Sequence, residues 1–341
     1  MKNSDRQNRL TKTFVPDAPI YLTLPPIGGK VLSGQLILTG SVTLAGGTAN
    51  GTVVGEGGPI NLLKRISVFA NPAGGSRYPG GRIVNCSPRG LLRFATFMHE
   101  GRFVGDLFGS TLGGGANGTY QIYLSIPIYF ADPTKRRQVE TALNSDPTAY
   151  QMIQVKVDTA DIAACFAGNN ATVTYNLELQ WQDDRENFAG DTVCLFQEDH
   201  VRQIPATNPR MLDEGMPRDG AFLDWLILSE ESTDYTLSDA LLNKVTLDGP
   251  ELEYEKYSDD ILAQMIYDAW LNPAQSGTGM RYIDFTDGLL TGAVDAATLQ
   301  AQFDVNNVSG ANEDDLLIFT RRAFYPAGYQ PAFGPGAAKH S

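Results

Sequence analysis

The sequence predicts an all-β fold of two tandem eight-stranded jelly-roll barrels, each with a short inserted helix. Three observations carry this prediction. Apolar and polar residues alternate with a period of two along much of the chain, which is typical of strands with one buried face. Glycine and proline are abundant, at 35 and 19 of 341 residues, as the turns of an all-β fold require. Finally, one order of elements runs through the chain twice.

The first pass of this order begins with a long alternating strand at residues 34–44. A second strand, which opens on a pair of leucines, is expected at residues 62–69. A helix is expected over residues 88–98, because Ser87 can cap it and Pro88 suits a first helical position. Three more alternating strands follow, at residues 120–130, 153–157 and 173–181.

The second pass repeats the order with shorter loops. Its strands are expected at residues 222–228, 241–247, 281 onward, 299–305 and 316–324. Its helix is expected at residues 259–271, starting at Ser258 with Asp259 and Asp260 in the first turn, where they favour the positive end of the helix dipole. The leucine pair at 241 matches the pair at 62 with a spacing of 179, and Ile261 matches Leu91 with a spacing of 170. About eight strands with one inserted helix fit a jelly roll better than an immunoglobulin sandwich.

A charged break at residues 183–187 separates the two passes, so we place the boundary near residue 188. The predicted organisation has four parts: an N-terminal arm at residues 1–12, a first jelly roll at 13–187, a second at 188–335, and a C-terminal tail at 336–341.

The net charge of −13 argues against nucleic-acid binding by the folded body, which has no basic excess to neutralise phosphates. The first twelve residues differ, since they carry four basic residues and one acidic residue, a net charge of +3. These residues are Lys2, Arg6, Arg9 and Lys12, with Asp5. Two interpretations are open. This segment is either a disordered terminus or a basic arm that contacts an anionic lipid or nucleic-acid layer.

Residues with catalytic chemistry are sparse. The cysteines Cys86, Cys165 and Cys194 match no metal spacing and no disulfide framework, so we expect reduced thiols. No apolar run follows Met1, and no stretch reaches the ~20 apolar residues of a membrane span, so we expect neither a secretory signal nor a membrane anchor. The acidic run at residues 312–315 is expected to be a solvated turn rather than a calcium loop. We therefore predict no metal, no cofactor and no enzymatic activity.

The rival hypothesis is a β-sandwich protein that binds carbohydrate or hydrolyses glycans. Such a protein needs a platform of aromatic side chains or two carboxylates that flank a cleft. The candidate platform residues are Tyr175, Trp181, Trp225 and Trp270. Their places on strand and helix faces favour core packing instead.

Two segments carry a family resemblance: residues 58–68, which begin Gly-Pro-Ile-Asn-Leu-Leu-Lys-Arg, and residues 125–131. With the order of elements and the length, they resemble the double jelly-roll major capsid proteins of tailless icosahedral bacteriophages, the tectivirus-like lineage. The resemblance implies a homotrimer that forms a pseudo-hexagonal tile in a virion shell assembled in the host cytoplasm. It further implies contacts with neighbouring capsomers and with penton or minor capsid proteins. Lys2, Arg6, Arg9 and Lys12 would then lie on the inner face, near an internal membrane or the genome.

Overall fold

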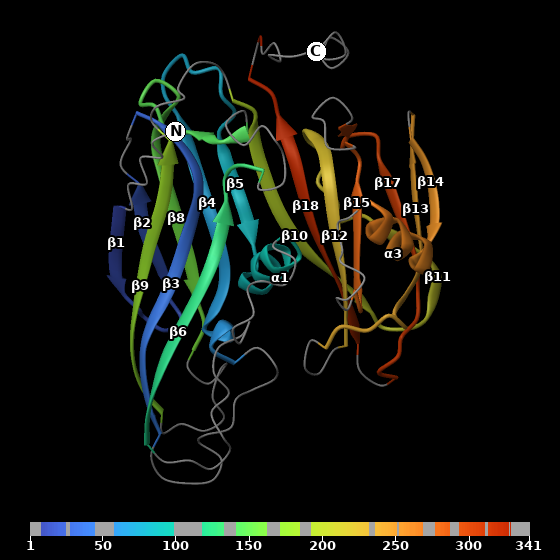
Figure 1. Cartoon of the computed structure of the whole chain (residues 1–341), viewed down its shortest axis with the longest axis horizontal. Coiled ribbons are helices and arrows are strands. Elements are labelled where there is room, and N and C mark those ends of the chain that lie inside the picture. Colours follow the sequence, from blue (N-terminus) through green and yellow to red (C-terminus); the bar gives the residue numbers. More distant parts are fainter. Residues whose placement is uncertain are drawn as a thin grey trace.

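The computed structural model in Figure 1 covers the whole chain. It describes residues 8–24, 28–44, 58–98, 118–132, 141–161, 171–184, 192–231, 236–250, 252–268, 277–286, 293–310, 313–326 and 328. We call the elements β1–β9 with α1 the first half, and β10–β18 with α3 the second half.

The first half contains two four-stranded antiparallel layers. The first layer has the order β1 (Asn8–Thr13), β9 (Ala171–Asp184), β3 (Lys30–Leu44), β6 (Gly118–Tyr129). The second layer has the order β2 (Pro19–Leu24), β8 (Tyr150–Thr159), β4 (Leu63–Pro72), β5 (Gly81–Cys86). A two-residue strand, β7 (Leu143–Asn144), pairs with β3.

The second half repeats this plan strand by strand. One layer has the order β10 (Cys194–Ile204), β18 (Asp314–Phe324), β12 (Ala221–Glu230), β15 (Met280–Asp284). The other has the order β11 (Asn208–Asp213), β17 (Gln300–Val305), β13 (Leu242–Gly249), β14 (Leu252–Tyr257). The short β16 (Val294–Asp295) pairs with β12, as β7 pairs with β3. Every strand is thus numbered nine above its counterpart, which confirms the predicted pair of jelly rolls.

The two helices occupy equivalent places. Helix α1 (Pro88–Met98) lies between β5 and β6, and α3 (Ser258–Tyr267) lies between β14 and β15; a 3-10 turn (Gly58–Leu62) precedes β4. The predicted bounds of α1 are confirmed, and α3 ends at Tyr267, before the predicted end at residue 271. Helix α3 starts at Ser258, with Asp259 and Asp260 in its first turn, as predicted. Tyr257 is the N-cap, and the Ser258 hydroxyl accepts a hydrogen bond from Nε of Arg281 at 2.7 Å.

One sheet runs through both halves, as Figure 1 shows. Strands β5 and β10 pair in parallel at Val84 and Asn85, which joins the β2-β8-β4-β5 layer to the β10-β18-β12-β15 layer. Successive residues of β12 and β18 are buried, so both faces of this part of the sheet are covered. Buried apolar residues of both halves form one continuous cluster. The halves therefore share a core.

The structure describes the chain at one of two predicted boundaries, the end of the N-terminal arm, but not at the boundary between the halves. Residue 188 lies outside the described residues, between β9 and β10, so that boundary stays a prediction. The arm at residues 1–12 overlaps a strand, because Asn8–Thr13 forms β1 and pairs with β9. Alternation in so short a segment gives little signal, and the hydrogen bonds to β9 fix the strand. Within the described residues, no helix is long and apolar enough to span a membrane.

Candidate functional site: the junction between the two halves

Helix α1 belongs to the first half but packs against the second. The rings of Phe94 and Phe319 of β18 stack with their centroids 4.5 Å apart. One turn later, the ring centroid of Phe97 lies 4.8 Å from that of Tyr282 on β15. All four side chains are buried. Aromatic pairs at these distances stabilise a contact beyond the area that they bury.

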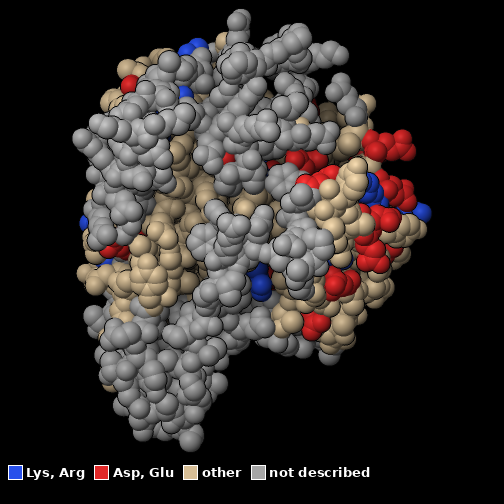
Figure 2. Space-filling model, viewed as in Figure 1, with Lys and Arg blue, Asp and Glu red and all other residues tan. Residues whose placement is uncertain are grey.

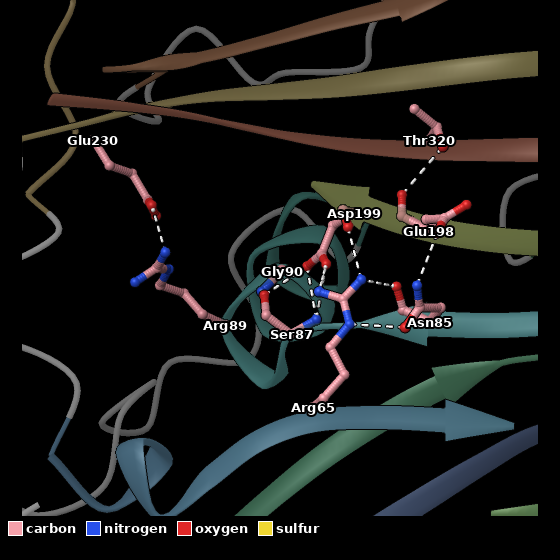
Figure 3. A network of polar contacts seen from close by, with 9 residues as sticks. All are labelled: Arg65, Asn85, Ser87, Arg89, Gly90, Glu198, Asp199, Glu230 and Thr320. Atoms are coloured by element: carbon pink, nitrogen blue, oxygen red, sulfur yellow. Dashed lines mark hydrogen bonds and ion pairs between the residues drawn. The ribbon is translucent and has the colours of Figure 1, made fainter. Parts of the chain in front are cut away.

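A polar network links the same elements, and Figure 3 shows it from close by. Arg65 of β4 donates from Nη1 to Oδ1 of Asp199 on β10 at 2.5 Å, and from Nη2 to the Asp199 carbonyl at 2.8 Å. Its Nε donates to Oδ1 of Asn85 on β5 at 2.8 Å. The Asn85 amide in turn donates to Oε1 of Glu198 at 2.8 Å. A single guanidinium thus ties together three strands at the parallel β5–β10 pairing.

Asp199 also extends the cap of α1. Its carboxylate accepts hydrogen bonds from the Ser87 backbone N–H at 2.8 and 2.9 Å and from the Ser87 hydroxyl at 2.5 Å. The Ser87 hydroxyl oxygen accepts from the Gly90 N–H at 2.9 Å, which confirms Ser87 as the predicted cap. A carboxylate at a helix N-terminus also interacts favourably with the helix dipole. The start of a first-half helix therefore depends on a second-half carboxylate.

Gly90→Ala is expected to destabilise the protein by about 1–3 kcal/mol, the range for overpacking a well-packed site. In most helices this change stabilises, by up to about 1 kcal/mol. Here a Cβ on Gly90 would overlap Oδ2 of Asp199 and lie 3.1 Å from the Ser87 hydroxyl oxygen. Urea denaturation of both proteins checks the sign, and a more stable variant would contradict this geometry.

A second group of charges is fully buried behind α1. Arg321 of β18 donates from Nε to Oδ1 of Asp224 on β12 at 2.8 Å, and its Nη2 also pairs with that carboxylate. Nη1 lies 3.4 Å from Oδ1 of Asp132, which follows β6 in the first half. The Tyr282 hydroxyl donates to Asp224 at 3.0 Å, and the Arg321 guanidinium lies 4.9 Å from the Phe94 ring centre. Burial raises the pKa of Asp224, while Arg321 opposes that rise.

Glu230, at the end of β12, pairs with the first turn of α1. Its carboxylate is 3.0 Å from Nη2 of Arg89, as Figure 3 shows, and it is buried. Burial raises the pKa of Glu230 to about 7 from its ordinary 4.5. Arg89 and Arg93 on α1 oppose this rise, while Asp315 and Asp199 add to it.

We expect stability to fall as the pH rises toward neutrality because of Glu230. The pKa of Glu230 is higher in the folded state than in the unfolded state, so protonation of this carboxyl favours folding. This contribution to stability is complete below about pH 4.5 and is lost as the pH rises past about 7. The shift corresponds to roughly 3 kcal/mol. Urea denaturation of the wild type and Glu230→Gln at about pH 5 and pH 8 measures it. The wild type should lose stability relative to the variant on going to pH 8, and a constant difference would contradict the raised pKa.

From the sequence, only one of the charged residues of this junction was singled out. Arg65 lies in the segment at 58–68 that carries the family resemblance, whereas Asp199, Asp224 and Arg321 were missed. A signal for two of them existed, since Asp224 interrupts an apolar run in β12 and Arg321 lies inside the final apolar strand. Charges in such positions indicate buried partners.

The predicted inner-face residues lie elsewhere. Lys2 and Arg6 fall outside the described residues. Arg9 and Lys12 belong to β1, opposite Gln180 and Leu177 of β9, and the Lys12 side chain is exposed. Their contact with an inner layer stays a prediction.

The remaining predicted chemistry has clear outcomes where the structure describes it. Cys86 and Cys194 are free and buried, whereas Cys165 lies outside the described residues. Within those residues, no cluster of His, Cys, Asp and Glu could hold a metal ion. The solvated turn at 312–315 is wrong for Asp314, which is buried because it accepts hydrogen bonds from the backbone N–H groups of Val308 and Ser309 at 2.7 and 3.0 Å.

Of the aromatic platform candidates, only Trp225 has a described side chain. It is fully buried between Phe222 and Phe285, with ring centroids 5.1 and 5.4 Å away. Trp225 therefore cannot stack on a sugar, and its core role is confirmed.

Comparison with known proteins finds likeness in structure and none in sequence. No family model matches the chain, and no curated protein matches it. The MCP of STIV (Sulfolobus turreted icosahedral virus) matches with a TM-score of 0.64 at 13% identity, over 96% of this chain and 100% of that one. The Faustovirus major capsid protein gives 0.59 at 10%, over 95% and 91%. The major capsid protein of bacteriophage PM2 gives 0.54 at 12%, over 94% and 100%. Together with the repeated strand order, these likenesses establish that the chain has the double jelly-roll fold.

Proposed function

We propose that this chain is a major capsid protein that trimerises into pseudo-hexagonal capsomers and tiles an icosahedral shell. The observation that carries the proposal is the strand-by-strand repeat of one barrel plan within a single chain. Three such chains present six similar barrels, so a trimer can occupy a position with six neighbours. The solved structures of similar fold include major capsid proteins of a bacteriophage and of other viruses.

The junction supports this proposal, because a tile must hold its two barrels at a fixed angle. A shared sheet, a shared core, and buried ion pairs between Arg321 and the carboxylates Asp224 and Asp132 leave little freedom between the halves. Function then resides in surfaces rather than in a catalytic site. We assign the first jelly roll to residues 13–187 and the second to 188–335, with a tail at 336–341.

The partners follow from the same proposal. Each trimer contacts neighbouring capsomers in the virion and meets penton or minor capsid proteins at special positions of the shell. Lys2, Arg6, Arg9 and Lys12 form a basic inner surface for an internal membrane or the genome. We place the protein in the lineage of tailless icosahedral bacteriophages, with assembly in the host cytoplasm.

Analytical ultracentrifugation and negative-stain electron microscopy of the purified chain test the proposal. We expect a species of three times 37.0 kDa, or larger regular tiles and shells. A monomer that persists at micromolar concentration would overturn the proposal.

A further inference from the structure

Helices α1 and α3 are equivalent elements of the repeat. Helix α1 packs on β6 and β4 of its own half, and α3 packs on β15 and β13, the counterparts of those strands. Leu91 and Ile261, which the spacing of 170 aligns, are each buried. The inward faces of the two helices therefore correspond.

Their outward faces have different surroundings. On α1 this face reaches the second half through Arg89, which pairs with Glu230, and through Phe97, which packs on Tyr282. The same spacing of 170 places Asp259 and Tyr267 at these positions of α3. The side chain of Asp259 is 97% exposed, and Tyr267 is 85% exposed. Ile266 beside it is also exposed. Helix α3 thus presents to solvent the face that α1 uses for docking.

The surfaces that would receive these helices also correspond. Helix α1 covers the layer of β18, β12 and β15, whose counterpart is the layer of β9, β3 and β6. The register shift between Val31 and Ser33 in β3 recurs between Phe222 and Asp224 in β12, which sets a spacing of 191 (222 minus 31). That spacing makes Thr39 of β3 the counterpart of Glu230.

The part of this counterpart surface near Thr39 is exposed, whereas Ile37 and Pro127 on the same face are buried. Thr39 is partly exposed, and its neighbour across the β3–β6 pairing, Tyr123, is 65% exposed. A phenol O–H at this place can donate a hydrogen bond to a carboxylate such as that of Asp259. Large exposed tyrosines are also the side chains that interfaces favour.

We propose that the outward face of α3 docks on the β9-β3-β6 layer of a second copy of this chain. The contact repeats, between copies, the contact that α1 makes within one chain, with Asp259 near Tyr123. This inference rests on the proposed function, and it names the surfaces through which the copies would join.

The distribution of charge favours this pairing of unlike halves. Residues 1–187 hold 17 basic and 14 acidic residues, a net charge of +3, whereas residues 188–341 hold 9 and 25, a net charge of −16. Figure 2 shows Asp and Glu side chains gathered over the second half, where Glu253, Glu255 and Asp259 are exposed. Contact between two second halves would bring like charges together, whereas a first half adds no such repulsion.

Sedimentation of Tyr267→Asp and Tyr123→Asp tests the inference. Each change places a charge in one of the two docking surfaces, so each variant should need a roughly tenfold or higher concentration to assemble. Tyr21→Asp is the matched control, because Tyr21 is 47% exposed on β2, outside both surfaces, and it should assemble as the wild type does. Circular dichroism and urea denaturation identify any variant that fails to fold.

Mixing the two variants sharpens the test. Each keeps one intact surface, so a Tyr267→Asp copy and a Tyr123→Asp copy can still join once, and we expect heterodimers where each variant alone is monomeric. Assembly of both single variants at wild-type concentration would overturn the inference and leave the capsid proposal standing. A wild type that stays monomeric would overturn both.

Discussion

Replacement of Arg321 by methionine is expected to lower the free energy of unfolding by about 3–5 kcal/mol, the range for breaking a buried ion pair by removing one partner. Methionine keeps an unbranched apolar stem beside Phe94 and removes only the charged group. The loss leaves the carboxylates of Asp224 and Asp132 buried without their guanidinium. Removing Arg321 lets the pKa of Asp224 rise further, so the loss should be smaller at about pH 5 than at about pH 8.

Lys64→Met is the matched control for this experiment. Lys64 pairs with Asp17 at 2.6 Å, but the two side chains are 55% and 68% exposed, so its loss should cost less than about 1 kcal/mol. Urea denaturation followed by tryptophan fluorescence measures both variants. Equal effects of the two changes would contradict the dominant role of the buried cluster.

The sequence predicts those parts of the fold that local patterns determine. Along β3, Leu36 and Leu38 are buried and Gln35 and Thr39 are partly exposed, as the alternation predicts, whereas Ile37 on the second face is buried as well. Helix α1 carries its own start signal in Ser87 and Pro88, so its bounds were confirmed. Features of this kind depend on neighbours in the sequence.

The strands missing from the sequence-based prediction are not all without local signals, since residues of β2 (Pro19–Leu24) alternate strictly between exposed and buried. In β14 (Leu252–Tyr257) no residue is buried, and β5 (Gly81–Cys86) is a six-residue strand with four consecutive buried positions. Exposure alternates along β14 without any residue becoming fully buried, whereas β5 does not alternate; both strands are held in place by pairing with β13 and β4. The repeat of elements still gave the correct order of the halves, because its long strands and helices do carry local patterns.

The junction could not be predicted because its contacts are long-range. Arg65 and Asp199 are separated by 134 residues, and Arg321 and Asp224 by 97. Periodicity assigns a side chain to a face but does not name the partner that makes burial of its charge tolerable. Buried polar contacts contribute little net stability but fix how surfaces meet. We therefore hypothesise that this network sets the angle between the barrels, which small-angle scattering of junction variants can test.

Asp199→Ala is the second change with a large expected effect, a loss of about 3 kcal/mol or more. It removes the carboxylate that accepts from Nη1 of Arg65 and from the N–H and hydroxyl of Ser87. The chain should still fold around its shared core, but α1 should lose the second-half contribution to its cap. Urea denaturation measures the loss, and capsomer assembly should weaken with it if the angle between the barrels matters.

A double-mutant cycle with Gly90 separates this cap from general damage. In the wild type Gly90→Ala overlaps the Asp199 carboxylate and should destabilise. In the Asp199→Ala background that overlap is gone, and the same change should stabilise α1, by up to about 1 kcal/mol. The two effects have opposite signs, so their difference is a coupling energy of about 1–4 kcal/mol. An effect of Gly90→Ala that is equal in both backgrounds would show that Asp199 does not lie against the first turn of α1.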